Sequence, residues 1–208
     1  MKVLIAYDGS KGSDSALDDL VRAGLPRAGE AVVVSVADVW LPPTNGSRSP
    51  EDRPDPALDP ATEQWIKKQW DRGKAKLAEA ETLADHARKR VQMALPGWNV
   101  QLAATYGSPA WEIIEKADEF NADLIVVGSQ GRSAIGRFVL GSISQKVLTE
   151  ARCSVRIGRG KIEVDETPVR LLVGFDGSQG SIAALNAVAT RSWPAGSEVR
   201  VVSAAEEL

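Results

Sequence analysis

The chain has 208 residues, of which 43% are hydrophobic and 25% charged, and its formal net charge is -3. This length suits one packed domain with a smaller remainder, and the charge gives no overall attraction to nucleic acid or to an anionic membrane. The single Cys153 and the single His86 exclude an intramolecular disulfide and a Cys/His zinc site. The first residues are unlike a signal peptide and no apolar run reaches membrane-spanning length, so we expect a cytoplasmic protein that binds neither nucleic acid nor membrane.

Short β-branched runs alternate with helical patterns along the first part of the chain. In chain order we expect a strand over Lys2–Tyr7, a helix over Ser13–Ala23, a strand over Ala31–Val36, a long helix opened by Asp59-Pro60, a strand over Val100–Tyr106, a helix over Ser108–Phe120, a strand over Asp123–Val127, a helix over Ser142–Ala151 and a strand over Ser154–Ile157. The prolines between Leu41 and Pro60 predict a surface excursion. Strands separated by helices favour a parallel sheet covered on both faces.

The beginning of the chain is repeated near its end at an offset of 168 in numbering. Asp8-Gly9-Ser10 matches Asp176-Gly177-Ser178, and Val33-Val34-Ser35 matches Val201-Val202-Ser203. We therefore predict a domain over residues 1–158, a linker over 159–169 and a partial second repeat over 170–208. One strand-helix-strand unit cannot cover its own apolar faces, so it must pack on the first domain, exchange with another chain or stay partly disordered.

A glycine-rich segment, GSQGRSAIGRFVLGS, follows the strand predicted over Asp123–Val127. Gly128 and Gly131 are expected to turn the chain with positive φ and to let a ligand approach the main chain. Gly141-Ser142 opens a helix, whose first N–H groups and dipole favour an anion, and Arg132 or Arg137 can add positive charge. In the simpler interpretation Gly128 is a strand-end turn and Ser142 an N-cap.

The spacing Gly-x2-Gly-x9-Gly-Ser, filled by Gly128, Gly131, Gly141 and Ser142, resembles the nucleotide-binding motif of the universal stress protein family. The resemblance covers residues 1 to about 158, and the shortened repeat resembles the tandem arrangement of some members. It implies an α/β fold, a doubly wound, Rossmann-like parallel sheet of five strands in the order 3-2-1-4-5 that binds ATP, with or without Mg²⁺. Doubly wound sheets bind ligands where the winding reverses, beyond the carboxyl ends of the strands.

The resemblance also implies roles for single residues. Asp8 would lie near the ribose and adenine, and the main chain of Val36 would hydrogen-bond the adenine. The phosphates would be lined by Gly128, Gly131, Gly141, Ser142, Ile143 and Ser144, with Arg132 as a further candidate. Gln130 stands where many relatives have histidine, which leaves the phosphate contacts there open. The implied function is that of a stress-response binding or signalling module, whose signalling partner is unknown. The resemblance also implies a homodimer formed through the fifth strand, Ser154–Ile157.

Other functions are open for the same residues. The stretch DGSKGSDS, residues 8–15, resembles the loop of ATP pyrophosphatases, which are adenylating enzymes. A further alternative is an FMN-binding flavodoxin-like domain or a nucleotide-free partner-binding module. Neither a Walker motif nor a GxGxxG dinucleotide fingerprint is found. Because no acidic residue lies near the glycine-rich segment, we expect no dedicated catalytic or metal-ligating set, and at most slow ATP hydrolysis with help from Asp8.

Overall fold

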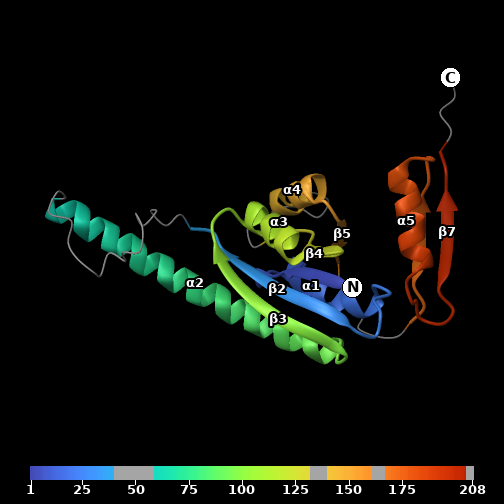
Figure 1. The fold of residues 1–208 in the computed structure, drawn as a ribbon, viewed down its shortest axis with the longest axis horizontal. Coiled ribbons are helices and arrows are strands. Elements are labelled where there is room, and N and C mark those ends of the chain that lie inside the picture. Colours follow the sequence, from blue (N-terminus) through green and yellow to red (C-terminus); the bar gives the residue numbers. More distant parts are fainter. Residues whose placement is uncertain (40–58, 132–139, 161–166, 205–208) are drawn as a thin grey trace, which may run out of the picture.

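The computed structural model describes residues 1–39, 59–131, 140–160 and 167–204. Five parallel strands form the main sheet in the order β3-β2-β1-β4-β5, which confirms the predicted α/β topology (Figure 1). The strands are β1 (Lys2–Ala6), β2 (Gly29–Ala37), β3 (Trp98–Tyr106), β4 (Leu124–Gly128) and β5 (Ser154–Gly158). Because β1 pairs with both β2 and β4, the winding reverses beside β1.

The helices of this unit are α1 (Lys11–Asp18), continued by the 3-10 helix η1 (Asp19–Arg22), then α2 (Pro60–Ala94), α3 (Pro109–Phe120) and α4 (Ser142–Glu150). The first helix begins before the predicted Ser13, because the Ser10 hydroxyl accepts the Ser13 N–H as an N-cap. The long helix begins as predicted, with the Asp59 carboxylate accepting from two N–H groups of the first turn at 3.0 and 3.1 Å. The predicted proline-rich excursion lies almost entirely outside the described residues.

Alternate side chains of the strands pack into two separate cores. On one face Val3 and Ile5 of β1 meet Leu17 of α1 and the small residues Ala84 and Ala87 of α2. On the other face Leu4 of β1 and Ile125 of β4 meet Ile113 of α3 and Val147 of α4. Burial on both faces is why these strands read as continuous apolar runs in the sequence.

The second copy of the repeat folds as β6 (Arg170–Gly174), α5 (Gln179–Ala189) and β7 (Glu198–Val202), with the two strands parallel. Its geometry repeats that of the first copy. The Tyr7 N–H donates to the Val34 carbonyl at 2.9 Å, and the Phe175 N–H donates to the Val202 carbonyl at 2.8 Å. Residues 161–166 of the predicted linker lie outside the described residues, and the domain boundaries remain predictions.

This second unit touches the first without covering its own faces. The Ser192 N–H donates to the Gly24 carbonyl at 3.2 Å, beside a contact of Arg191 with the Ala23 carbonyl. Leu172 is 72% exposed, whereas the matching Leu4 is fully buried. The structure therefore gives the unit a contact with the first domain and leaves the expected apolar surface uncovered. No helix in the described ranges is long and apolar enough to cross a membrane.

Candidate functional site

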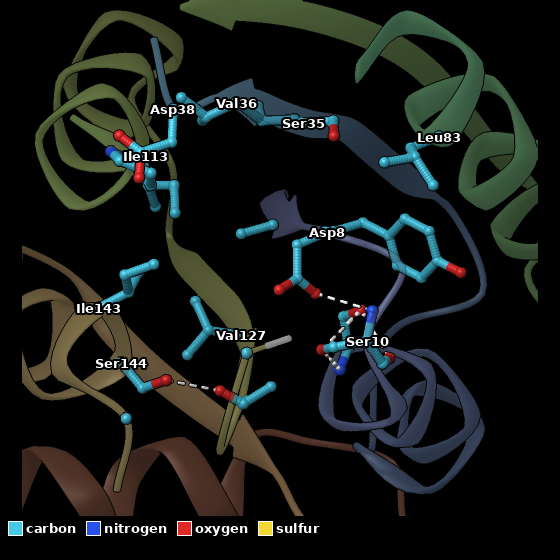
Figure 2. A pocket seen from close by; sticks show the side chains of 18 of the residues that line it. Asp8, Ser10, Ser35, Val36, Asp38, Leu83, Ile113, Val127, Ile143 and Ser144 are labelled. Atoms are coloured by element: carbon cyan, nitrogen blue, oxygen red, sulfur yellow. Dashed lines mark hydrogen bonds between the residues drawn. The ribbon is translucent and has the colours of Figure 1, made fainter. Parts of the chain in front are cut away.

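A cavity of about 570 Å³ lies at the carboxyl ends of β1, β2 and β4 (Figure 2). This volume is in the range of ordinary small-molecule sites. The structure brings eight of the predicted site residues together in its wall: Asp8, Val36, Gly128, Gly131, Gly141, Ser142, Ile143 and Ser144. The ninth, Arg132, lies outside the described residues, as does Arg137.

The amino terminus of α4 opens into this cavity without a side-chain cap. Gly141 is the N-cap, so the interpretation of Ser142 as the N-cap is wrong; Ser142 is the first helical residue. Within the described parts of the chain, no acceptor is found for the N–H groups of Ser142, Ile143 and Ser144. In α1, by contrast, the Ser10 hydroxyl satisfies the N–H of Ser13 at 3.2 Å. The open donors and the helix dipole make this corner attractive for an anion.

The Ser144 side chain fixes α4 against the end of β4. Its hydroxyl donates to the Gly128 carbonyl at 2.6 Å, as Figure 2 shows. The Gly141 N–H donates to the Ser129 carbonyl at 2.9 Å. These two bonds hold the first turn of the helix at the cavity wall, and they use the Ser144 hydroxyl, which leaves its N–H as the group offered to a ligand.

The glycines are required for reasons that differ from the expected ones. Positive φ was predicted at Gly128 and Gly131, and this is wrong for both. A Cβ on Gly128 would lie 2.4 Å from the Gly12 carbonyl carbon and 2.5 Å from the Ser13 nitrogen, so the residue makes room for the first turn of α1. A Cβ on Gly131 would lie 3.1 Å from a carboxylate oxygen of Asp8. What comes close to these glycines is therefore the protein itself.

Asp8 follows the end of β1 and serves both the turn and the cavity. One carboxylate oxygen accepts the Ser10 N–H at 3.0 Å, across Gly9, whose φ of 74° favours glycine. The other oxygen lies beside Gly131. Figure 2 shows the carboxylate directed into the cavity. The structural role and the proposed ligand role are thus compatible in one side chain.

The main chain of Val36 faces the cavity because β2 extends beyond β1. The Val34 carbonyl points toward β1, where it accepts the Tyr7 N–H. Main-chain directions repeat every second residue along a strand, so the N–H and carbonyl of Val36 point to the same side. Ala6, the last residue of β1, pairs with Val34, so Val36 lies past the end of that strand. Its polar groups therefore border the cavity.

No sequence pattern indicates the part of the cavity wall that α2 contributes. Ala80 and Leu83 line the cavity, with Lys76 and Glu79 from the same helix. An ion network holds α2 in place: Arg90 pairs with Asp14 and Asp18 of α1, and the Tyr7 hydroxyl donates to Asp14 at 2.9 Å. Burial, followed by that hydrogen bond, raises the pKa of Tyr7 above its ordinary value. Only the packing of a helix far along the chain creates this wall.

The sequence model of the universal stress protein family matches residues 1–159. The universal stress protein YxiE of Bacillus subtilis is 30% identical over 158 residues, which cover 76% of this chain and 98% of that protein. A universal stress protein of Mycobacterium tuberculosis is 29% identical over 182 residues, or 85% of this chain. The match covers 54% of the mycobacterial protein, so the chain spans about half the length of that relative.

The fold is also similar to solved structures. A universal stress protein from Archaeoglobus fulgidus matches with a TM-score of 0.63 and 21% identity, over 99% of this chain and 68% of that one. A universal stress protein solved in complex with cAMP matches with a TM-score of 0.46 over 76% of this chain. A member of the family from Arabidopsis thaliana, solved with AMP bound, matches with a TM-score of 0.45 over 77% of this chain.

Proposed function

Because this chain belongs to the universal stress protein family, we propose that it binds ATP in the cavity between β1 and β4 and acts as a cytoplasmic stress-response binding or signalling module. The observation that carries the proposal is the uncapped amino terminus of α4. Its N–H groups at Ser142, Ile143 and Ser144 have no acceptor among the described residues and border a cavity of nucleotide size. Main-chain donors at a helix amino terminus are a common phosphate site.

The remaining wall supplies a partner for each part of the nucleotide. The triphosphate lies against the first turn of α4 and the glycine-rich segment, where Arg132 adds charge. The Asp8 carboxylate accepts from a ribose hydroxyl, since a carboxylate is a strong acceptor. The N–H and carbonyl of Val36 read the polar edge of the adenine. The ligand thus spans from α4, across the end of β1, to β2.

We expect Mg²⁺ to arrive with the nucleotide. Among the described residues, no group of three or more His, Cys, Asp or Glu side chains gathers to hold a metal ion. Asp8 lines the cavity, where its proposed partner is the ribose, and Mg²⁺ is commonly held by substrate phosphates and water together with one or two carboxylates. The donor set fits an ion carried by ATP, and binding with at most slow hydrolysis is the proposed activity.

Calorimetric titration with ATP, AMP and cAMP tests the proposal. We expect ATP to bind the wild type, and Asp8→Asn to weaken it by roughly 10-fold or more, because a hydrogen bond to a charged group is worth about 1.5–3 kcal/mol. Asp176→Asn is the matched control, since Asp176 holds the same position in the second repeat and makes the same turn bond. Its affinity should equal that of the wild type.

A second variant separates the phosphate corner from the ribose contact. A Cβ on Gly141 would meet its nearest atoms at 3.5 Å, an ordinary contact, so Gly141→Val should fold and place methyl groups at the α4 terminus. ATP should then bind weakly or not at all. Unchanged ATP affinity in both Gly141→Val and Asp8→Asn would move the site elsewhere. A yellow preparation that releases FMN, or pyrophosphate release with substrate adenylation, would favour the other two functions instead.

We further propose a homodimer through the outer edge of β5, as the resemblance implies. This strand is the last in the sheet order, and its described partner is β4. An unpaired strand edge offers main-chain donors and acceptors to a second chain. Light scattering at micromolar concentration should give a dimeric mass, and a monomeric mass would contradict this proposal.

A further inference from the structure

The cavity is lined from both faces of the sheet, and we call the part lined by Ala80 and Leu83 of α2 the lobe beside α2. Side chains alternate along a strand, so neighbours in sequence enter different lobes. Val36 packs in the core that contains Ile113 of α3, whereas Tyr7 belongs to the core on the α2 side. In Figure 2, Val36 lies on the side of Ile113, and the Ser35 oxygen is directed into the cavity on the side of Leu83. The lobe beside α2 contains none of the predicted site side chains.

Ser35 brings an unpartnered hydroxyl into this lobe. Its side chain is only 2% exposed, and no hydrogen bond of this hydroxyl is found within the described ranges. The other buried serines of the cavity wall differ. The hydroxyls of Ser10, Ser13 and Ser144 donate to main-chain carbonyls at 3.2, 2.9 and 2.6 Å. The Ser35 residue lines the cavity and its hydroxyl is directed into it, so a ligand bound there can be the partner of this hydroxyl.

The surroundings of Ser35 indicate the chemistry of that group. The lobe is walled by the apolar side chains of Ala80 and Leu83 and by the Tyr7 ring. The Tyr7 hydroxyl is engaged with Asp14, and Lys76 pairs with Glu79 at 2.7 Å. Ser35 is therefore a polar side chain that can contact a ligand there without first breaking a bond within the described residues. A flat, largely apolar ring with a few polar edge atoms fits such walls.

We infer that Ser35 is a specificity-determining residue whose hydroxyl hydrogen-bonds the purine base of the nucleotide. The base extends from the main chain of Val36 into the lobe beside α2, whereas the phosphates lie at α4, on the opposite side of the strand ends. This inference rests on the proposed function, because it assigns one contact within that site. The inference adds a side chain that contacts the base, whereas the other proposed base contact, at Val36, is made by main-chain groups.

The test compares ATP with inorganic tripolyphosphate, which has no base. In calorimetry, Ser35→Ala should weaken ATP about 2- to 12-fold, the usual net worth of one hydrogen bond. Tripolyphosphate, measured by direct titration, should bind the variant as it binds the wild type. Ser203→Ala is the control at the matching, exposed position of the second repeat and should change neither affinity. Ser35→Leu, which fills the lobe, should lose ATP and keep tripolyphosphate.

The outcomes separate this inference from the proposed function. If the wild type does not bind ATP, both are overturned. If the wild type binds ATP and Ser35→Ala binds it equally well, the inference alone is overturned. Equal weakening of ATP and tripolyphosphate in Ser35→Ala would indicate a general structural role and would also overturn it. The melting temperature without nucleotide should be the same for Ser35→Ala and the wild type, because the hydroxyl has no partner in the described residues.

Discussion

Replacing Gly128 by alanine tests why the glycine-rich segment begins with glycine. The new Cβ would lie 2.4 Å from the Gly12 carbonyl carbon and 2.5 Å from the Ser13 nitrogen. Ordinary contact begins near 3.4 Å, so α1 and β4 would have to separate by almost 1 Å. Both obstructing atoms are main chain, and no rotamer change can relieve the overlap.

The expected loss follows from this overlap. An extra methyl group forced into a packed interior typically costs about 1–3 kcal/mol, and the reduced freedom of the unfolded chain returns about 0.4–1 kcal/mol at most. Because the obstruction is rigid, we expect the cost to lie near the upper end and the free energy of unfolding to fall by about 2 kcal/mol. For a chain of this size each kcal/mol corresponds to about 2–4 °C, so the melting temperature should fall by about 4–8 °C.

Urea unfolding and calorimetric melting of Gly128→Ala measure this effect, with Gly141→Ala as the control. A Cβ on Gly141 meets its neighbours at 3.5–3.8 Å, and its φ of -64° suits alanine. That variant should unfold within about 1 kcal/mol of the wild type, the small loss being that of alanine as a poorer N-cap than glycine. If Gly128→Ala is as stable as Gly141→Ala, close packing of α1 is not the reason for the glycine.

Three further predictions use other parts of the structure. Ser10→Ala should reduce the free energy of unfolding by about 1–3 kcal/mol, because it removes both the N-cap of α1 and a hydrogen bond to the Gln130 carbonyl. Ser178→Ala removes only the matching cap of α5 and should cost less, so equal losses would refute this reasoning. Hydrogen bonds from Ser178 lower the pKa of Asp176 to about 2. The stability that these bonds give is therefore complete above pH 4 and is lost as the pH falls through 2. An NMR titration that gives Asp176 a pKa near 3.8 would contradict this prediction. Burial raises the pKa of Cys153, so alkylation at pH 7 should be slower than for free cysteine, and a rate equal to that of glutathione would count against it.

The sequence alone determined the order and type of the elements, because their signals are local. The Asp59-Pro60 pair opens α2, and the apolar run before Gly128 is β4. The offset of 168 between the two copies reappears as the same strand register, Lys2 with Glu30 and Arg170 with Glu198. Eight of the residues lining the cavity were also predicted, from the resemblance to the universal stress protein family, whereas the residues that α2 contributes were not.

The tertiary structure alone decided what each residue does at that edge. Gly128 is required because α1 packs closely against it, which no sequence pattern predicts. The N-cap of α4 is Gly141 in the structure, not Ser142. In the sequence Ser35 looks like an ordinary strand residue, yet in the structure its hydroxyl lines the cavity together with residues of α2 and has no hydrogen-bond partner among the described residues. Such roles depend on distances between residues far apart in the chain, and a local pattern contains no information about those distances.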